Sequence, residues 1–221
     1  MEMEKQYIKI QKELEKRLGI KMNIPNKKLI LSLEDNLRKI YEYGEDLGDH
    51  CIAVSIIGAY IGHCLDLIPD EIDELFIAGA LHDIGKLFIP KQIIDKPGSL
   101  DEDERKIIES HPAYSIWYLT SGTDEEKPQY YSHKILDMIR YHHEEVSGHG
   151  YPYGLKRSQI NAGAKILAIA DKFEAYGAKR SYHEARTLSE CISFLERQAD
   201  KSIIDKNITA EVVFILKQYV K

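Results

Sequence analysis

Apolar residues recur at intervals of three and four along most of this 221-residue chain, and no other feature of the sequence constrains its fold as strongly. In the first such stretch, Tyr7, Ile10, Leu14 and Leu18 lie on one face of a predicted helix that Gly19 ends. No segment shows the alternation of apolar and polar residues that is typical of a strand. We therefore expect an all-α helical bundle in which the helices bury their apolar faces in a shared core.

The predicted helices divide into a short N-terminal extension and a larger main domain. Residues 1–45 form the helical extension, which is too short for an independent domain, and residues 46–221 form the main domain. Ser158 and Thr209 are candidate N-caps of two helices in the main domain. Beyond the first helix, we expect helices at about residues 33–41, 49–65, 70–82, 101–111 (interrupted at Pro112), 130–144 and 158–176, and two more at the C-terminal end.

The bulk properties exclude several classes of function. The formal net charge of -6 argues against binding to polymeric nucleic acid, but a small anionic ligand remains compatible because metal ions can supply positive charge. We expect no membrane association, since there is neither a long apolar run nor a signal-peptide segment. Cys51, Cys64 and Cys191 form no CxxC pair, which favours a reducing cytoplasm and disfavours a thiolate zinc site.

Histidine and aspartate residues interrupt or end several of the apolar helical stretches. Each of them alone has an ordinary explanation as a core histidine, a surface histidine or a paired carboxylate. Together they suggest one internal site, because a helical bundle can turn residues from separate helices toward the same cavity. The residues concerned are His50 with Asp46 one turn before it, the pair His82-Asp83, His111, the pair His142-His143, and Asp171.

This combination of side chains favours a particular kind of metal chemistry. Imidazole and carboxylate ligands together suit Fe, Mn, Zn or Ni better than Ca or Mg alone. A carboxylate between two histidine groups can bridge two metals. Two metal ions roughly 3.5–4 Å apart can stabilise both the attacking and the leaving oxygen of a phosphoryl displacement.

Three segments of the chain resemble the HD-GYP family of the HD phosphohydrolase superfamily. They are HDIGKLFIPKQIIDKPGSLDEDERKIIESHP from His82, HHEEVSGHGYPYGLK from His142, and AKILAIADKFEAYGAKRSYHEA from Ala164. The resemblance extends from about Gly48 to Ala185, and its motifs occur in the family's order and spacing. It implies an HD-domain-like helical bundle that acts as a metal-dependent phosphodiesterase.

The resemblance also implies a ligand set for two divalent transition-metal ions, with Fe or Mn as the leading candidates and Zn, Ni or Mg as alternatives. Asp46 occupies the position at which some family members carry a glutamate for a third metal, so it is a candidate extra ligand. By resemblance, Asp83 bridges the two metals; the first is held by His50, His82, Asp83 and Asp171, and the second by His111, His142 and His143.

The expected catalytic residues are Asp83 and Lys86, of which Lys86 matches the family's lysine near the scissile phosphate. Lys86, Tyr151 of the Gly-Tyr-Pro loop, and Arg180 are the expected substrate contacts. The segment Arg-Ser-Tyr-His from Arg180 stands where members that cleave cyclic di-GMP often carry Arg-Pro-Tyr-Lys. The resemblance therefore specifies the cyclic dinucleotide less strongly than it specifies the metal site. No functional role is assigned to His63, His133 or His149.

The leading hypothesis is a phosphodiesterase that hydrolyses cyclic di-GMP to pGpG and GMP with a metal-bridged hydroxide as the nucleophile. One alternative is an HD phosphohydrolase that acts on another cyclic dinucleotide or a nucleotide. A second is a non-catalytic module that binds cyclic dinucleotides in signalling. The Gly-Tyr-Pro loop could also contact protein partners. The amphipathic N-terminal helix could support a homodimer, although packing against its own bundle is the simpler expectation.

Overall fold

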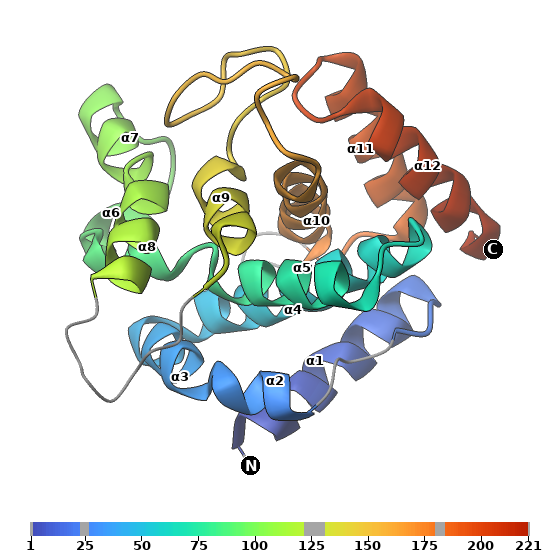
Figure 1. The fold of residues 1–221 in the computed structure, drawn as a ribbon, viewed down its shortest axis with the longest axis horizontal. Coiled ribbons are helices and arrows are strands. Elements are labelled where there is room, and N and C mark those ends of the chain that lie inside the picture. The colour runs from blue at the N-terminus through green and yellow to red at the C-terminus, as the bar shows by residue number, and fades with distance from the viewer. Residues whose placement is uncertain (1, 23–26, 122–130, 180–183, 221) are drawn as a thin grey trace.

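The structure is a computed structural model that describes residues 2–22, 27–121, 131–179 and 184–220. In these ranges the regular structure is helical, with one isolated bridge between Ser147 and Lys156 and no strand, which confirms the expected all-α class (Figure 1). No helix within these ranges has the length and hydrophobicity needed to cross a bilayer. The elements are α1 (Glu2–Leu18), α2 (Lys27–Ser32), α3 (Glu34–Tyr43), α4 (Glu45–Cys64), α5 (Pro69–Leu81), η1 (Ile84–Phe88), α6 (Lys91–Ile94), α7 (Glu102–Ile108), α8 (His111–Thr120), α9 (His133–Tyr141), α10 (Ala162–Gly177), α11 (Leu188–Asp200), α12 (Lys206–Leu216) and η2 (Lys217–Tyr219).

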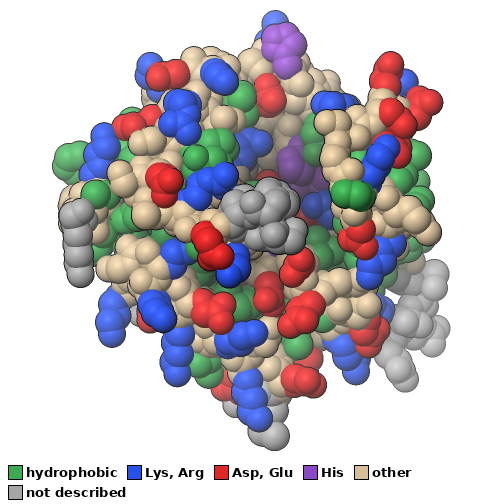
Figure 2. All heavy atoms as spheres, turned by 180° about the vertical axis from the view of Figure 1, so that it is seen from behind, with side chains coloured by type: hydrophobic (Ala, Val, Ile, Leu, Met, Phe, Trp, Pro, Cys, Tyr) green, Lys and Arg blue, Asp and Glu red, His purple; other side chains and the backbone are tan. Residues whose placement is uncertain are grey.

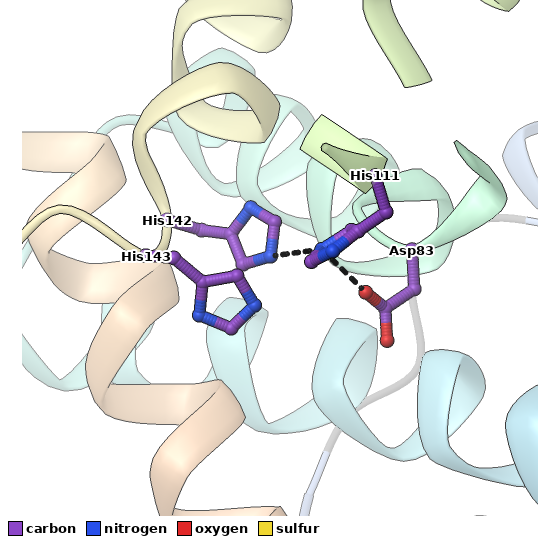
Figure 3. A group of neighbouring side chains, drawn as sticks. All are labelled: Asp83, His111, His142 and His143. Atoms are coloured by element: carbon purple, nitrogen blue, oxygen red, sulfur yellow. Dashed lines mark hydrogen bonds and ion pairs between the residues drawn. The ribbon is translucent and has the colours of Figure 1, made fainter. Parts of the chain in front are cut away.

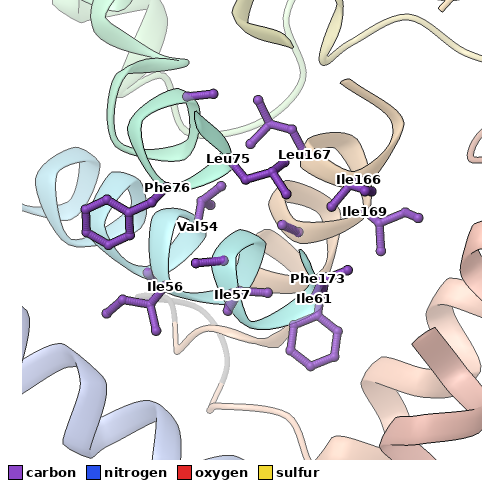
Figure 4. Close-up of a cluster of buried hydrophobic side chains, with 14 of the residues drawn as sticks. Val54, Ile56, Ile57, Ile61, Leu75, Phe76, Ile166, Leu167, Ile169 and Phe173 are labelled. Atoms are coloured by element: carbon purple, nitrogen blue, oxygen red, sulfur yellow. The ribbon is translucent and has the colours of Figure 1, made fainter. Parts of the chain in front are cut away.

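The centre of the bundle is α4, which is packed between α5 and α10 (Figure 4). Helix α4 is apolar around most of its circumference, as expected of a helix surrounded by other helices. Ile57 and Val54 of α4, Leu75 of α5 and Leu167 of α10 are all buried in this region. The buried core therefore holds in place the three helices that supply His50, His82-Asp83 and Asp171.

Helix α1 packs against the other helices of its own chain, which was the simpler of the two expectations for this helix. Its predicted apolar face is buried, and the ring of Tyr7 stacks on Phe76 of α5 at a centroid distance of 5.3 Å. Gly19 ends the helix with a φ of +70°, a conformation that favours glycine. The residues of α1 share one apolar core with those of α4 and α5. The division into residues 1–45 and 46–221 stays a prediction.

Two predicted helix caps are wrong. Helix α10 begins after Asn161, whose side chain accepts a hydrogen bond from the Ala164 N–H at 2.7 Å, and Ser158 lies in the preceding turn. Helix α12 begins after Asp205, and Thr209 is buried one turn inside it. In both cases the cap is the residue directly before the first helical residue, Asn161 or Asp205. Asparagine caps a helix about as well as serine, and aspartate caps it better than threonine.

The contact between α4 and α5 generates a stability prediction. A Cβ atom added at Gly79 of α5 would lie 2.6 Å from the Cα of Ser55, so Gly79→Ala should destabilise the protein by about 1–3 kcal/mol through overpacking. At Gly58 of α4 the nearest atom to an added Cβ is 3.8 Å away. Gly58→Ala is the matched control and should change stability by less than about 1 kcal/mol, or increase it through helix propensity. Urea unfolding measures the free energy of unfolding of both variants. An equal loss of stability in the two would contradict the close packing at Gly79.

Candidate metal centre

Five helices bring the predicted metal ligands to one place. His50 lies in the first third of α4, and Asp171 lies in α10. Helix α5 ends at Leu81, and His82 and Asp83 follow it directly. Helix α9 ends at Tyr141, and His142 and His143 follow it directly. The expected interruption near Pro112 is the start of a new helix, because α8 begins at His111 and has the proline at its second position.

Asp83 is shared by two groups of side chains. Asp83, His111, His142 and His143 offer ligand atoms that all lie within 4.8 Å of one another (Figure 3). The ligand atoms of His50, His82 and Asp83 lie equally close together. The Asp83 Oδ1 atom is 3.1 Å from His111 Nε2. The Oδ2 atom is 3.3 Å from His82 Nε2 and 3.6 Å from His50 Nε2. Each carboxylate oxygen thus faces one group, which is the arrangement of a bridging ligand.

Asp171 adds a second carboxylate to the group around His50 and His82. Its Oδ1 atom is 3.2 Å from His50 Nε2 and 3.9 Å from His82 Nε2. The structure therefore brings together all seven residues of the predicted ligand set. Asp46 belongs to neither group and lies exposed on α4, one turn before His50.

Three of the imidazoles are oriented by backbone carbonyls of the preceding helices. His82 Nδ1 is 2.8 Å from the carbonyl oxygen of Gly79, and His142 Nδ1 is 2.7 Å from that of Ile139. His111 Nδ1 is 2.8 Å from the carbonyl oxygen of Ile108. Carbonyls in the last turn of a helix lack intrahelical partners, so they can accept the Nδ1–H. The Nε2 atoms of His82 and His111 then face Asp83, and that of His142 lies 3.4 Å from His111 Nε2, so all three rings turn Nε2 toward the cluster as a metal ligand requires.

His50 is oriented by Glu174, a residue that the sequence analysis missed. The Glu174 carboxylate is buried and bonds to His50 Nδ1 across 124 residues of sequence. Glu174 follows Asp171 by three positions, so both point from the same side of α10. That spacing was the only signal in the sequence, and it is common on solvent-exposed helices.

The charges of the cluster suit a divalent cation. Burial, together with neighbouring imidazoles, holds the pKa values of His142 and His143 well below the usual range, so these rings are neutral. Burial would raise the pKa of the Asp83 carboxyl, but His82 and Lys86 outweigh it and hold that pKa well below its usual value. For His50, burial lowers the pKa but Glu174 and Asp171 raise it to about 10. A metal at His50 therefore has to displace a proton.

Two buried atoms in the cluster test whether a metal fits. His82 Nε2 and Asp83 Oδ1 are buried and have no hydrogen-bond partner among the described residues. An uncompensated buried polar atom is costly, and a coordinated ion removes that cost. The seven residues therefore fit the nitrogen and oxygen ligand sets of divalent transition metals.

A buried serine and a glycine join the His82-Asp83 turn to α8. The Ser115 hydroxyl accepts a hydrogen bond from the Gly85 N–H at 2.8 Å and lies 3.0 Å from the His82 carbonyl oxygen, to which it donates. A Cβ atom at Gly85 would lie 2.0 Å from the carbonyl oxygen of His111. Glycine is required here because the two backbones touch. Neither residue was predicted to have a role.

Lys86 and Tyr151 lie at the edge of the cluster. Lys86 Nζ is 2.5 Å from Asp83 Oδ2, and 22% of its side chain is exposed. The ring centroid of Tyr151 is 4.7 Å from that of His143, and the Tyr151 N–H donates to the His143 carbonyl. The Gly-Tyr-Pro loop is held by Glu144, a second buried acid that the sequence analysis missed, which accepts from the backbone N–H groups of residues 153 and 155. Arg180 lies outside the described residues.

Residues 27–208 match a family model described as "HD domain". The chain is 35% identical to the cyclic di-GMP phosphodiesterase response regulator RpfG of Xanthomonas campestris over 66% of this chain and 37% of the relative. It is 31% identical to 3'3'-cGAMP-specific phosphodiesterase 1 of Vibrio cholerae over 77% of this chain and 38% of the relative. The chain thus spans little more than a third of the length of these curated relatives.

Two solved structures have a similar fold. One is the HDG"Y"P protein Bd1817 of Bdellovibrio bacteriovorus, with a TM-score of 0.59 and 18% identity over 76% of this chain and 52% of the other. The other is the HD domain of the Listeria monocytogenes phosphodiesterase PgpH in complex with cyclic-di-AMP, with a TM-score of 0.50 and 17% identity over 90% of this chain and 100% of the other. At these identities the likeness concerns the fold.

The shared position of Asp83 predicts that one substitution affects both groups. Asp83→Ala should lower the content of divalent metal in both groups, because each loses the oxygen that faces it. Elemental analysis of protein purified without oxygen and loaded with Mn²⁺ measures this. His149→Ala, at an exposed histidine outside the cluster, is the control and should bind as much metal as the wild type. Undiminished metal in the Asp83→Ala protein would contradict a bridging role.

The bond between Glu174 and His50 predicts a smaller and more local effect. Glu174→Gln keeps the shape of the side chain but removes the charge that orients His50, so affinity for one metal should fall about 10- to 100-fold. The group around His111 should keep its affinity. Competition with a chromophoric chelator resolves the binding of the first and the second metal ion. Glu196→Gln, at a surface residue, is the control and should bind both ions as the wild type does. If both steps weakened equally, Glu174 would not act through His50.

Proposed function

Because the chain belongs to the HD domain family, we propose that it is a metal-dependent phosphodiesterase that hydrolyses a cyclic dinucleotide, with cyclic di-GMP as the leading candidate. The observation that carries the proposal is the buried Asp83 carboxylate, which faces a separate group of imidazoles with each of its oxygens. Relatives named as cyclic di-GMP phosphodiesterases, from Xanthomonas campestris and Thermotoga maritima, support this substrate.

The site would hold two divalent ions, with Fe or Mn as the leading candidates. His50, His82, Asp83 and Asp171 would hold one, and His111, His142 and His143 would hold the other together with Asp83. When bound, the ions would lower the pKa of a water nucleophile and offset charge on the phosphoryl oxygens.

Lys86 has two roles in the proposed reaction. In the absence of substrate its ammonium group lies against Asp83 Oδ2 with part of the side chain exposed, so it can turn toward a phosphate that approaches the cluster. There it neutralises negative charge as the water oxygen bonds to phosphorus and the bond to the 3'-oxygen breaks. It can also donate the proton that the departing 3'-oxygen needs. The first product from cyclic di-GMP would be pGpG, and a second cut would give GMP.

A direct assay tests the proposal. The chain is loaded with Mn²⁺ or Fe²⁺ without oxygen and incubated with cyclic di-GMP, and the products are separated by chromatography. We expect pGpG to form and its formation to stop when a chelator removes the metal. Metal-loaded protein that leaves every cyclic dinucleotide intact would overturn the proposal.

A second candidate substrate is 3'3'-cGAMP, because three relatives that are 31–35% identical to the chain are named as phosphodiesterases specific for it. The segment that begins at Arg180, where the chain departs from the family pattern, also leaves the substrate open. A panel of cyclic di-GMP, 3'3'-cGAMP and cyclic di-AMP ranks the candidates by kcat/KM. Tight binding without turnover would instead indicate the non-catalytic signalling module.

Three further expectations stay predictions. They are a homodimer through α1, partner contacts through the Gly-Tyr-Pro loop, and a cytoplasmic location.

The role of Lys86 is tested by substitution. Lys86→Ala should lower kcat by about 10²- to 10³-fold, because a charge aimed at the phosphoryl group is lost. Metal content should not fall, since Lys86 is not among the groups of ligand atoms. Lys91→Ala is the matched control, because the Lys91 ammonium contacts the Tyr43 carbonyl and not the cluster. An unchanged kcat in the Lys86→Ala protein would remove Lys86 from the mechanism.

A further inference from the structure

His143 is the most accessible imidazole of the candidate metal centre. The side chains of His82 and His111 are at most 1% exposed and that of His50 is 9% exposed, whereas His143 is half-buried. Seen from behind, the molecule has a hollow in which histidine side chains are visible (Figure 2). An imidazole at the edge of a site is enclosed by less protein, so its ring needs a specific contact to stay in the orientation of a metal ligand.

The other four imidazoles are each oriented by a hydrogen-bond acceptor. Backbone carbonyls hold three of them, and the Glu174 carboxylate holds His50. Nowhere in the described part of the chain do the ring nitrogens of His143 have a hydrogen-bond partner. A ring that is free to turn loses rotational freedom when it binds a metal, and this loss lowers the affinity. Another kind of support is therefore required at His143.

The ring of Tyr151 supplies that support. Its centroid lies 4.7 Å from the centroid of the His143 ring, and the two planes are inclined by 30°, a spacing at which aromatic rings attract each other. The contact also involves the main chain, because the Tyr151 N–H donates to the His143 carbonyl at 3.2 Å. A Cβ atom at Gly150 would lie 2.5 Å from the same carbonyl oxygen. The backbone that carries the tyrosine therefore touches the backbone that carries the ligand.

The position of Tyr151 is set by the carboxylate of Glu144. This buried side chain belongs to the residue directly after His143. It accepts one hydrogen bond on each oxygen, from the N–H of Tyr153 at 2.7 Å and from the N–H of Leu155 at 2.8 Å. An amide in its place could accept at only one of its two ends. The loop is thus tied to the neighbour of the ligand that its tyrosine contacts.

We propose that Tyr151 is a positioning residue for the metal ligand His143, and that Glu144 holds it in place. The ring of Tyr151 does for His143 what the carbonyls and Glu174 do for the other imidazoles. The inference rests on the two-ion site of the function proposed above. It deepens that function, because it gives the ring of Tyr151 a role in metal binding that is separate from the substrate contact expected of this residue.

Substitutions of Tyr151 test the role of its ring. Tyr151→Leu removes the aromatic contact and should lower the affinity for the ion of the group that contains His143 about 2- to 10-fold, the range that one aromatic pair contributes. The group around His50 should keep its affinity, which also shows that the variant is folded. Tyr151→Phe keeps the ring and should bind both ions as the wild type does. Competition with a chromophoric chelator measures both affinities for Mn²⁺.

A matched control lies in the same loop. Tyr153→Leu removes an exposed aromatic ring that contacts Tyr141, outside the cluster, and it should leave both affinities unchanged. The inference would be overturned if Tyr151→Leu bound both ions as tightly as the wild type. It would also be overturned if the two affinities fell by the same factor, because a general loosening of the fold would then explain the loss.

The role of Glu144 is tested in metal-free protein, where activity plays no part. The ring-proton NMR signals of His143, assigned by their absence in His143→Ala, should shift in Tyr151→Leu because the ring current of the tyrosine is lost. Glu144→Gln should shift them in the same direction, since the loop loses one of two backbone bonds. Glu145→Gln, whose carboxylate accepts from the Ser147 hydroxyl, is the control and should leave the signals in place. Unchanged signals in Glu144→Gln would overturn the role of Glu144.

Metal affinity and hydrolysis are separate outcomes. If Tyr151→Leu weakens one ion selectively and the wild type hydrolyses no cyclic dinucleotide, the positioning role is supported and the proposed hydrolysis is overturned. If the wild type hydrolyses cyclic di-GMP and Tyr151→Leu binds both ions as the wild type does, the positioning role is overturned and the proposed function stands.

Discussion

The candidate site depends on one buried charge, the carboxylate of Asp83. An ionised carboxylate in an apolar bundle is unfavourable unless positive or hydrogen-bonding groups surround it. Here the ammonium group of Lys86 lies 2.5 Å from Oδ2, and imidazoles from α4, α8 and the end of α5 lie close to both oxygens. The burial of α4, α5 and α10 in one core is what allows such a group to be excluded from water. Core and site are thus parts of the same arrangement of helices.

The geometry of the imidazoles follows from where the helices end. His82 and His142 stand just after the last residue of a helix, and His111 stands three residues after the end of α7; each of the three reaches the carbonyl three residues earlier. No additional side chain is needed to orient these three rings. His50 lies inside a helix, where carbonyls are already bonded, so a carboxylate from α10 takes over that role.

Much of this arrangement could be predicted from the sequence, and the exceptions have a common reason. The helical period predicted the all-α fold, and the resemblance to the HD-GYP family, confirmed by the comparisons, supplied the residues that converge around Asp83. Glu174, Glu144 and Ser115 were missed because each acts on a partner that is close in space but is not marked by any local pattern. The N-caps Asn161 and Asp205 were missed because other polar residues that can cap a helix, Ser158 and Thr209, stand within four residues of them. The periodicity of α1 predicted which face is buried, but it could not predict which helices that face packs against.

The contact at Gly85 has a consequence for the kind of ion that the two groups can accept. The turn that carries Asp83 meets the start of α8 backbone to backbone, and Ser115 bonds to His82 before Asp83 and to Gly85 two residues after it. Main chains in direct contact cannot move closer, and hydrogen bonds at the same place oppose their separation. The distance between the two groups of ligands therefore resists change. A rigid span discriminates by ionic radius, so ions much larger than the first-row transition metals would be disfavoured by size as well as by ligand chemistry.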